Sequence, residues 1–146
     1  MTSVEASSSW ALAGGAKPPR LPEGIDLPRD RMLVMGILNV TPDSFSDGGR
    51  FLDPGAALDH AQEMLDEGAD LVDLGGESTR PNSTRISEDE EWERIGSIIQ
   101  RLAASGVVVS VDTLHALTAR RAADAGAAII NDVSGGRWDP QMNAAV

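Results

Sequence analysis

Short apolar runs alternate with stretches of helical periodicity from Met32 onward, and this pattern predicts alternating strands and helices. The first run, Met32–Leu38, is unbroken and therefore predicts a strand that is buried on both faces. Further strands are predicted at Leu71–Leu74, at Val107–Val111 and around Ile129–Ile130. Because short connections separate these elements, the pattern is typical of parallel strands joined by right-handed crossovers.

Helices are predicted between these strands from their start and stop signals. Asp53–Pro54 provides an N-cap and a first helical residue, and Ser87 with Glu90 forms a capping box. A third helix is predicted from about Leu114 to Ala125, and Asp139–Pro140 predicts the start of a fourth. Glycines that can end a helix in the left-handed conformation follow the first three: Gly68, Gly106 and Gly126.

The division of the chain follows from the same pattern. Residues 1–30 are rich in Ser, Ala, Gly and Pro without an apolar period, and they predict a flexible N-terminal tail before a folded part at 31–146. Within the folded part, Gly68–Asp73 is echoed by Gly126–Asn131 two β/α units later. This periodicity is compatible with an open doubly wound sheet and with a (β/α)8 barrel.

Charge and composition narrow the classes of partner. The formal net charge is −11, from 12 basic and 23 acidic side chains, so a polyanion such as nucleic acid is not expected to bind. No apolar run approaches the ~18 residues of a membrane helix, so no membrane partner is expected either. The chain has no cysteine, which excludes thiolate metal sites and Cys nucleophiles and fits a reducing compartment, here the cytoplasm.

Polar residues follow every predicted strand, where both β/α architectures place their sites. They are Asn39 after the first strand, Asp73 and Glu77 after the second, Asp112 after the third, and Asn131 and Asp132 after the fourth. A single Asp at a strand end is more often a helix cap, but four strands ending in Asn or Asp favour a binding site. Amide and carboxylate groups suit a flat heterocycle that offers N–H donors beside a carbonyl. His60 and His115 stand outside these positions; His60 is interpreted as a surface residue and His115 as structural, so a three-His zinc site is unsupported.

Two loops after strands could also contact a ligand, although either could be a plain connector. The loop at 41–49 is rich in turn residues and carries Phe45, which suits a lid that stacks on a ligand. The loop at 75–81 combines glycines, hydroxyls and Arg80, which suits an anion. No G-x-S-x-G elbow, G-x-G-x-x-G motif or Walker motif occurs.

Together these segments resemble dihydropteroate synthase, a family of pterin-binding enzymes. The matching motifs, in collinear order over residues 32–146, are MGILNVTPDSFSD at Met35–Asp47, GGESTRP at Gly75–Pro81, SVDT at Ser110–Thr113 and IIND at Ile129–Asp132. The resemblance implies a (β/α)8 barrel and a transferase of folate biosynthesis. It would join 4-aminobenzoate to 6-hydroxymethyl-7,8-dihydropterin diphosphate with the help of Mg²⁺, releasing diphosphate. It also allows a homodimer.

The resemblance assigns roles to individual residues. Asn39 would touch the metal–diphosphate end, and Thr79, Asp112 and Asn131 would bind the pterin. Three loop residues would border the aminobenzoate pocket: Phe45, Thr79 and Pro81. Asp43 and Arg80 would act in the ordered catalytic loop assembly. No enzyme nucleophile is required, because the departing diphosphate leaves a cation-like carbon conjugated with the pterin.

The sequence departs from the family pattern in two ways. Pro81 is followed by Asn82 and Ser83 where the family usually has Gly and Ala. The chain also ends before the family's later pterin-binding Asp and its diphosphate-binding Lys and Arg-x-His. We therefore expect a truncated barrel that is inactive alone. The alternatives are a non-catalytic pterin-binding paralogue, a pterin-binding methyltransferase domain and a (β/α)8 enzyme of unrelated chemistry.

Overall fold

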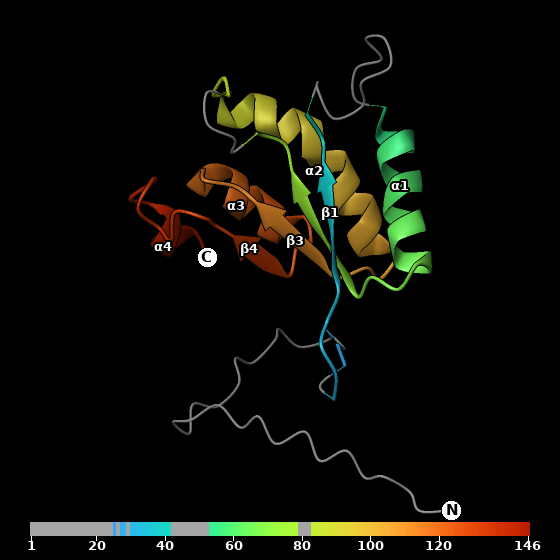
Figure 1. Ribbon diagram of the computed structural model, residues 1–146. Helices are drawn as coiled ribbons and strands as arrows, with labels where there is room; N and C mark the ends of the chain where they lie inside the picture. The colour runs from blue at the N-terminus through green and yellow to red at the C-terminus, as the bar shows by residue number, and fades with distance from the viewer. Residues whose placement is uncertain (1–24, 26, 29, 42–52, 79–82) are drawn as a thin grey trace, which may run out of the picture.

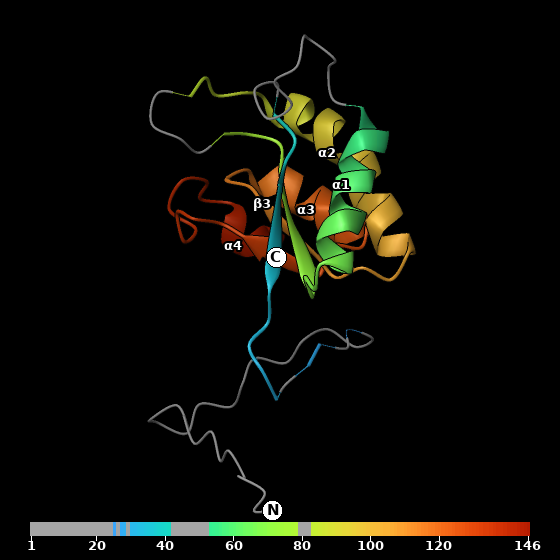
Figure 2. The same cartoon turned by 45° about the vertical axis from the view of Figure 1, so that its right-hand side comes forward.

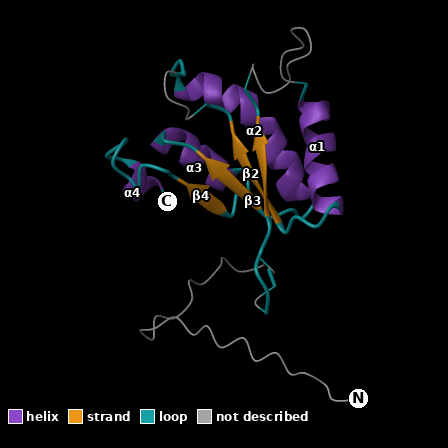
Figure 3. Ribbon diagram, in the orientation of Figure 1, coloured by secondary structure: helices purple, strands orange, loops and turns teal. Residues whose placement is uncertain are grey.

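Strands and helices alternate along the described chain. The computed structural model describes residues 25, 27, 28, 30–41, 53–78 and 83–146, so most of the predicted tail at 1–30 lies outside it. The strands are β1 Met35–Asn39, β2 Leu71–Gly75, β3 Val109–Asp112 and β4 Ile129–Asn131. The helices are α1 Pro54–Asp66, α2 Glu88–Ala104, α3 Ala116–Asp124 and α4 Met142–Ala145 (Figures 1 and 3). The strands and first three helices agree with the predicted elements to within a few residues.

The strands form one parallel sheet in the order β1-β2-β3-β4. Helices α1, α2 and α3 lie on the same face of this sheet, as the two views in Figures 1 and 2 show. Sequential strand order with these three helices on one face is what successive right-handed β/α units produce. Among the described residues, no helix is long and apolar enough to cross a membrane.

The hydrophobic core lies between the sheet and these helices. Leu38, Leu74 and Val111 point toward the helices and are fully buried. They pack with Ile95 and Ile99, which lie on the apolar face of α2. Because side chains alternate across a strand, the residues between these positions face the opposite side of the sheet.

The prediction that the first strand is buried on both faces is wrong. β1 begins at Met35 rather than Met32, and Ile37 is 60% exposed while the neighbouring Leu38 is 0% exposed. β1 lies at an edge of the sheet, and the described helices cover only the face that Leu38 occupies. The apolar run of β1 therefore has one buried and one exposed face in this chain.

The predicted start and stop signals of the helices are largely confirmed. Asp53 caps α1 by accepting a hydrogen bond from Gly55 N–H (2.9 Å), and Ser87 caps α2 by accepting from Glu90 N–H (3.2 Å). Gly68 ends α1 with a positive φ of 109°, which glycine adopts without a Cβ penalty. A backbone hydrogen bond typical of a Schellman motif follows each of the first three helices. The N–H groups of Ala69, Val107 and Ala127 donate to the carbonyl oxygens of Met64, Leu102 and Ala122, respectively. The internal repeat in the sequence thus marks a repeated helix–strand junction.

The fourth helix does not begin at Asp139–Pro140 as predicted. α4 begins at Met142, and the Asp139 carboxylate instead accepts hydrogen bonds from Gln141 N–H and from Ala116 N–H, both at 2.9 Å. His115, the N-cap of α3, makes no side-chain cap bond, so Asp139 caps α3 from another loop. These backbone hydrogen bonds lower the pKa of Asp139 below its ordinary value.

Candidate functional site

The predicted site residues that the structure describes meet at the carboxyl edge of the sheet. The strand register aligns Asn39, Gly75, Asp112 and Asn131 as successive partners across the four described strands. A Cβ atom placed on Gly75 would lie 3.6 Å from Asn39 Oδ1 and 3.8 Å from Asp112 Oδ2. The side chains of β1 and β3 therefore converge over the glycine that separates them.

Asn131 is held in place by a carboxylate from a different strand. Its Nδ2 donates to Asp73 Oδ2 at 3.1 Å. Asp73 lies in β2, two residues before Gly75, which aligns with the ends of the other strands. Because an ionised carboxylate only accepts, this contact orients the amide. The Asn131 carbonyl oxygen and its second N–H then keep a defined direction toward a ligand.

Three buried polar atoms on the face away from the helices have no hydrogen-bond partner among the described residues: Asp73 Oδ1, Ser110 Oγ and Asp112 Oδ1. Leaving a buried polar atom unpaired costs about 1–3 kcal/mol. Three of them on adjacent strands indicate a surface that ligand or solvent atoms complete.

Electrostatics also distinguish Asp112. Burial raises the pKa of its carboxyl to about 6. Three neighbouring carboxylates add to the rise: Asp73, Asp132 and Glu77. A ligand that donates hydrogen bonds to Asp112 would therefore stabilise an ionised group that the protein itself leaves short of donors.

The remaining predicted site residues lie outside the described part of the chain. These are Asp43 and Phe45 in the first loop and Thr79, Arg80 and Pro81 in the second. Asn39, predicted to face a metal, lies at the end of β1, across Gly75 from Asp112. Among the described residues no group of three or more His, Asp or Glu side chains is arranged to hold a metal ion.

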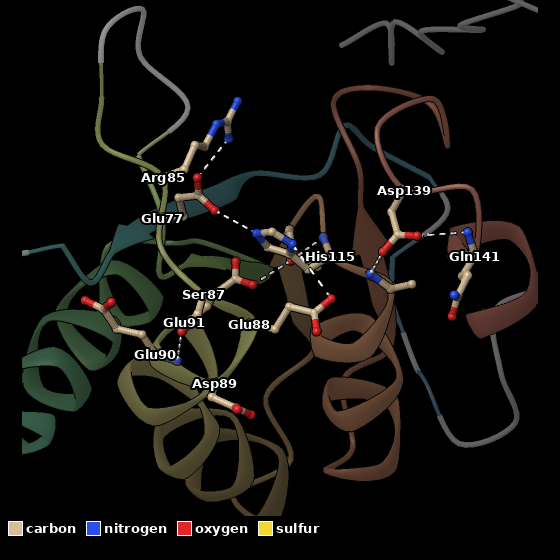
Figure 4. A network of polar contacts seen from close by, with 12 residues as sticks. Glu77, Arg85, Ser87, Glu88, Asp89, Glu90, Glu91, His115, Asp139 and Gln141 are labelled. Carbon is tan, nitrogen blue, oxygen red and sulfur yellow. Dashed lines mark hydrogen bonds and ion pairs between the residues drawn. The ribbon is translucent and has the colours of Figure 1, made fainter.

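His115, interpreted from the sequence as structural, makes a contact that the sequence did not predict. Its side chain is only 16% exposed, and its Nε2 lies 3.0 Å from Glu77 Oε2 (Figure 4). The other oxygen of Glu77 accepts from Arg85 Nη1 at 2.9 Å. His60, by contrast, is an exposed residue of α1, as expected. Glu77 and His115 each follow a strand end, and that shared position was the available signal.

A second buried carboxyl lies behind the strand ends. Glu91 is 0% exposed, and its Oε2 accepts a hydrogen bond from Thr113 Oγ1 at 2.9 Å (Figure 4). Burial raises the pKa of Glu91 above its ordinary value. Because Glu91 belongs to α2 and Thr113 follows β3, this contact fixes the first turn of α2 against the edge that carries Asp112.

Comparison with known proteins gives a family match over most of the chain. The model of the family described as "Pterin binding enzyme" matches residues 35–146. Dihydropteroate synthase from Bacillus subtilis is 54% identical over 115 residues, which are 78% of this chain and 40% of that protein. The chain thus spans about 40% of the length of such relatives.

Solved structures show the same fold. The chain resembles Xanthomonas albilineans dihydropteroate synthase with 4-aminobenzoic acid at a TM-score of 0.74 and 49% identity, covering 80% of this chain and 43% of that one. It resembles Burkholderia cenocepacia dihydropteroate synthase complexed with 7,8-dihydropteroate at a TM-score of 0.72 and 41% identity, covering 84% and 40%. The predicted barrel fold is confirmed, and this chain supplies four of its parallel β/α units.

Proposed function

Because the chain belongs to the pterin-binding enzyme family, we propose that it forms the pterin-recognising part of a dihydropteroate synthase. The reaction joins 4-aminobenzoate to 6-hydroxymethyl-7,8-dihydropterin diphosphate and gives 7,8-dihydropteroate and diphosphate for folate biosynthesis. The observation that carries this proposal is the buried Asp112 Oδ1, which has no partner in the described part of the chain, beside the fixed Asn131 amide at one sheet edge. The relatives named above, at 41–54% identity, support it.

The chemistry of these groups matches a pterin. The ring presents an amino group and a ring N–H on one edge, and two such donors suit a single carboxylate. Asp112 would accept them, and Asn131 would pair with ring atoms that both donate and accept. Asp112 would act as a recognition group and not as a general base, since the reaction requires no base at this end of the ring.

Catalysis would consist of orientation and electrostatic stabilisation. The C–O bond to the diphosphate breaks while the amine nitrogen of 4-aminobenzoate approaches the same methylene carbon. Positive charge develops on that carbon and spreads into the pterin. The carboxylates of Asp112 and Asp73 lie at the edge that would hold the ring, and their negative charge favours this state. A proton leaves the amine nitrogen when the new C–N bond is complete.

Mg²⁺ is the metal that we propose for the diphosphate. Asn39 fits this role by its chemistry, because its Oδ1 is an oxygen donor at the carboxyl edge, 3.6 Å from the position of a Gly75 Cβ. Mg²⁺ prefers oxygen ligands and commonly uses few protein groups together with water and substrate phosphate. Asn39 would hold it at the diphosphate end, where it would neutralise charge on the leaving group.

The other predicted roles remain proposals that rest on the resemblance. Thr79 would contact both substrates, and Phe45 and Pro81 would border the aminobenzoate. Asp43 and Arg80 would belong to the catalytic loop assembly. A homodimer and a cytoplasmic location are also proposed, and the absence of cysteine supports the latter.

A product assay tests the proposal. The protein in the length that its gene encodes is mixed with the two substrates and Mg²⁺, and dihydropteroate is measured by chromatography. We expect turnover from that protein and none from the 146-residue chain alone. Pterin binding without turnover by the gene-length protein would favour a non-catalytic paralogue. Binding of a methylated pterin with no use of the diphosphate would favour a methyltransferase domain.

A further inference from the structure

Glu77 links two neighbouring loops through both of its carboxylate oxygens. It follows β2, is 7% exposed, and lies 3.0 Å from His115 Nε2 through Oε2 and 2.9 Å from Arg85 Nη1 through Oε1 (Figure 4). Because an ionised carboxylate only accepts, His115 Nε2 donates in this contact. Arg85 lies beyond the second loop, and His115 is the N-cap of α3. The three residues therefore join the β2–α2 loop to the start of α3.

The partners of Glu77 are themselves fixed. The Arg85 guanidinium carbon lies 4.6 Å from the centre of the Trp138 ring, a cation–π distance that extends the contact to the loop after β4. The backbone N–H of His115 donates to Thr113 Oγ1 at 3.1 Å, and its Nδ1 lies 3.9 Å from Glu88 Oε1. Three loops at the carboxyl edge thus depend on one set of contacts, which we call the Glu77 network (Glu77, Arg85, His115 and Trp138).

The Glu77 network also joins the two flanks of residues 79–82. Glu77 and Arg85 pair across this segment, and closer to it Ser83 Oγ donates to the Ser78 carbonyl oxygen at 2.5 Å. The Glu77 carboxylate is also one of the neighbouring charges that raise the pKa of Asp112. The position of these flanks and the field at Asp112 are therefore coupled through a single carboxylate.

We propose that Glu77 is a positioning residue of the reaction: held by His115 and Arg85, it sets the flanks of segment 79–82 relative to Asp112. The inference rests on the proposed function for its consequence, because that function assigns substrate contacts to Thr79 and Pro81. Glu77 itself does not touch the reacting atoms in this scheme.

The test compares Glu77→Gln with Glu63→Gln in the gene-length protein. Glu63 also contacts a histidine, His60 at 3.3 Å, but its side chain is 73% exposed on α1. We expect Glu77→Gln to raise the KM for 4-aminobenzoate by about tenfold or more, since small displacements of substrate contacts have large kinetic effects. The Kd of pterin diphosphate, measured by calorimetry, should change less than this KM, because Asp112 and Asn131 are retained and Thr79 is its one proposed contact between the flanks. Glu63→Gln should change neither quantity.

A second readout does not depend on activity. Hydrogen exchange of the backbone amides at 83–87 should become about tenfold faster in Glu77→Gln and remain unchanged in Glu63→Gln. His115→Ala should reproduce the KM effect, and His115→Gln, which keeps a donor for Glu77, should recover part of it.

Two outcomes would overturn the proposal while the protein remains an active synthase. In the first, Glu77→Gln has the KM and exchange rates of Glu63→Gln. In the second, both substrates lose affinity equally, as general destabilisation would produce. If the unmodified gene-length protein makes no dihydropteroate, the proposed function itself fails, and the positioning role fails with it.

Discussion

Two aspartates at opposite ends of the sheet show how differently this fold treats a carboxylate. Asp70, just before β2, has Arg31 Nη1 and Val34 N–H as donors to its Oδ2, both at 2.8 Å. Hydrogen bonds from Arg31 lower the pKa of Asp70 below its ordinary value. Asp112, at the end of β3, has a buried Oδ1 with no partner among the described residues, and burial raises its pKa to about 6.

The hydrogen-bond partners and the direction of the pKa shift distinguish a structural carboxylate, Asp70, from a candidate functional one, Asp112. This distinction does not depend on sequence similarity. At the amino edge, one carboxylate joins β2 to the segment before β1, and its acceptor sites are used within the chain. At the carboxyl edge, Asp73 Oδ1 and Asp112 Oδ1 are buried and have no hydrogen-bond partner among the residues that the structure describes, so a ligand or solvent can satisfy them. Four substitution experiments can break or sharpen this contrast.

The largest expected effect concerns close packing at the two edges. A Cβ on Gly76, next to the carboxyl edge, would lie 2.9 Å from Ile95 Cγ2 and 3.2 Å from the Glu91 carbonyl oxygen. Gly76→Ala should lower the free energy of unfolding by about 2 kcal/mol, because α2 and its backbone must shift. In β1, a Cβ on Gly36 would meet Met64 Sδ at 2.7 Å, and a flexible thioether can rotate away. Gly36→Ala should therefore cost less than about 1 kcal/mol.

Urea unfolding of both glycine variants in the gene-length protein measures these costs. Equal losses would mean that the carboxyl edge is no more tightly packed than β1. A larger loss for Gly36→Ala would reverse the comparison.

The next effect concerns binding. Asp112→Asn should weaken pterin diphosphate binding by at least tenfold, about 1.4 kcal/mol, because the amide cannot accept two hydrogen bonds in parallel. Asp70→Asn makes the same chemical change at the other edge and should leave the Kd unchanged. Calorimetric titration of both variants gives the comparison, and unchanged affinity in Asp112→Asn would remove Asp112 from the pterin site.

A smaller effect of opposite sign is expected on stability. The pKa of Asp112 is raised from 3.8 to about 6 on folding, so the folded state binds a proton more tightly than the unfolded state. Stability without ligand should then fall as pH rises from about 4 to about 6 and level off above that range. The full shift corresponds to about 3 kcal/mol, which solvent screening at this partly buried carboxyl reduces to about 1 kcal/mol.

Asp112→Asn removes this penalty. It should raise the free energy of unfolding by about 1 kcal/mol at pH 7 and change it little at pH 4. Denaturant unfolding at the two pH values measures both. If the variant were less stable than the original at pH 7, the carboxylate would be a structural group like Asp70.

The sequence was sufficient for the parts of the fold that follow local rules. Strand and helix periods, capping residues and left-handed glycines located the elements. Because parallel strands end at a common edge, the sequence also predicted that Asn39, Asp112 and Asn131 lie at the same edge of the sheet. Each of these inferences depends on a pattern of neighbouring residues or on one topological rule.

The contacts that could not be predicted join residues far apart in the chain. Asp139 caps α3 at Ala116 across 23 positions, Arg31 reaches Asp70 across 39, and Glu77 reaches His115 across 38. Local signals pointed elsewhere, since Asp139–Pro140 has the form of a helix start. The exposure of β1 was also missed, because an apolar run does not reveal whether a second layer covers its other face.

The smallest expected effect concerns Asp70 itself. Its pKa is lowered in the folded state, so its contribution to stability is complete above its unfolded pKa, ~3.9. That contribution is lost as pH falls through the folded pKa. Arg31→Ala should therefore lower the melting temperature at pH 7, and the difference should shrink in strong acid. A double-mutant cycle with Asp70→Asn isolates the pair, since its coupling energy should vanish at low pH while that between Arg31 and Asp112 is zero throughout. A coupling energy that persisted after Asp70 is protonated would show that Arg31 acts through packing. The hydrogen bonds to the ionised Asp70 carboxylate would then not be what stabilises the amino edge of the sheet.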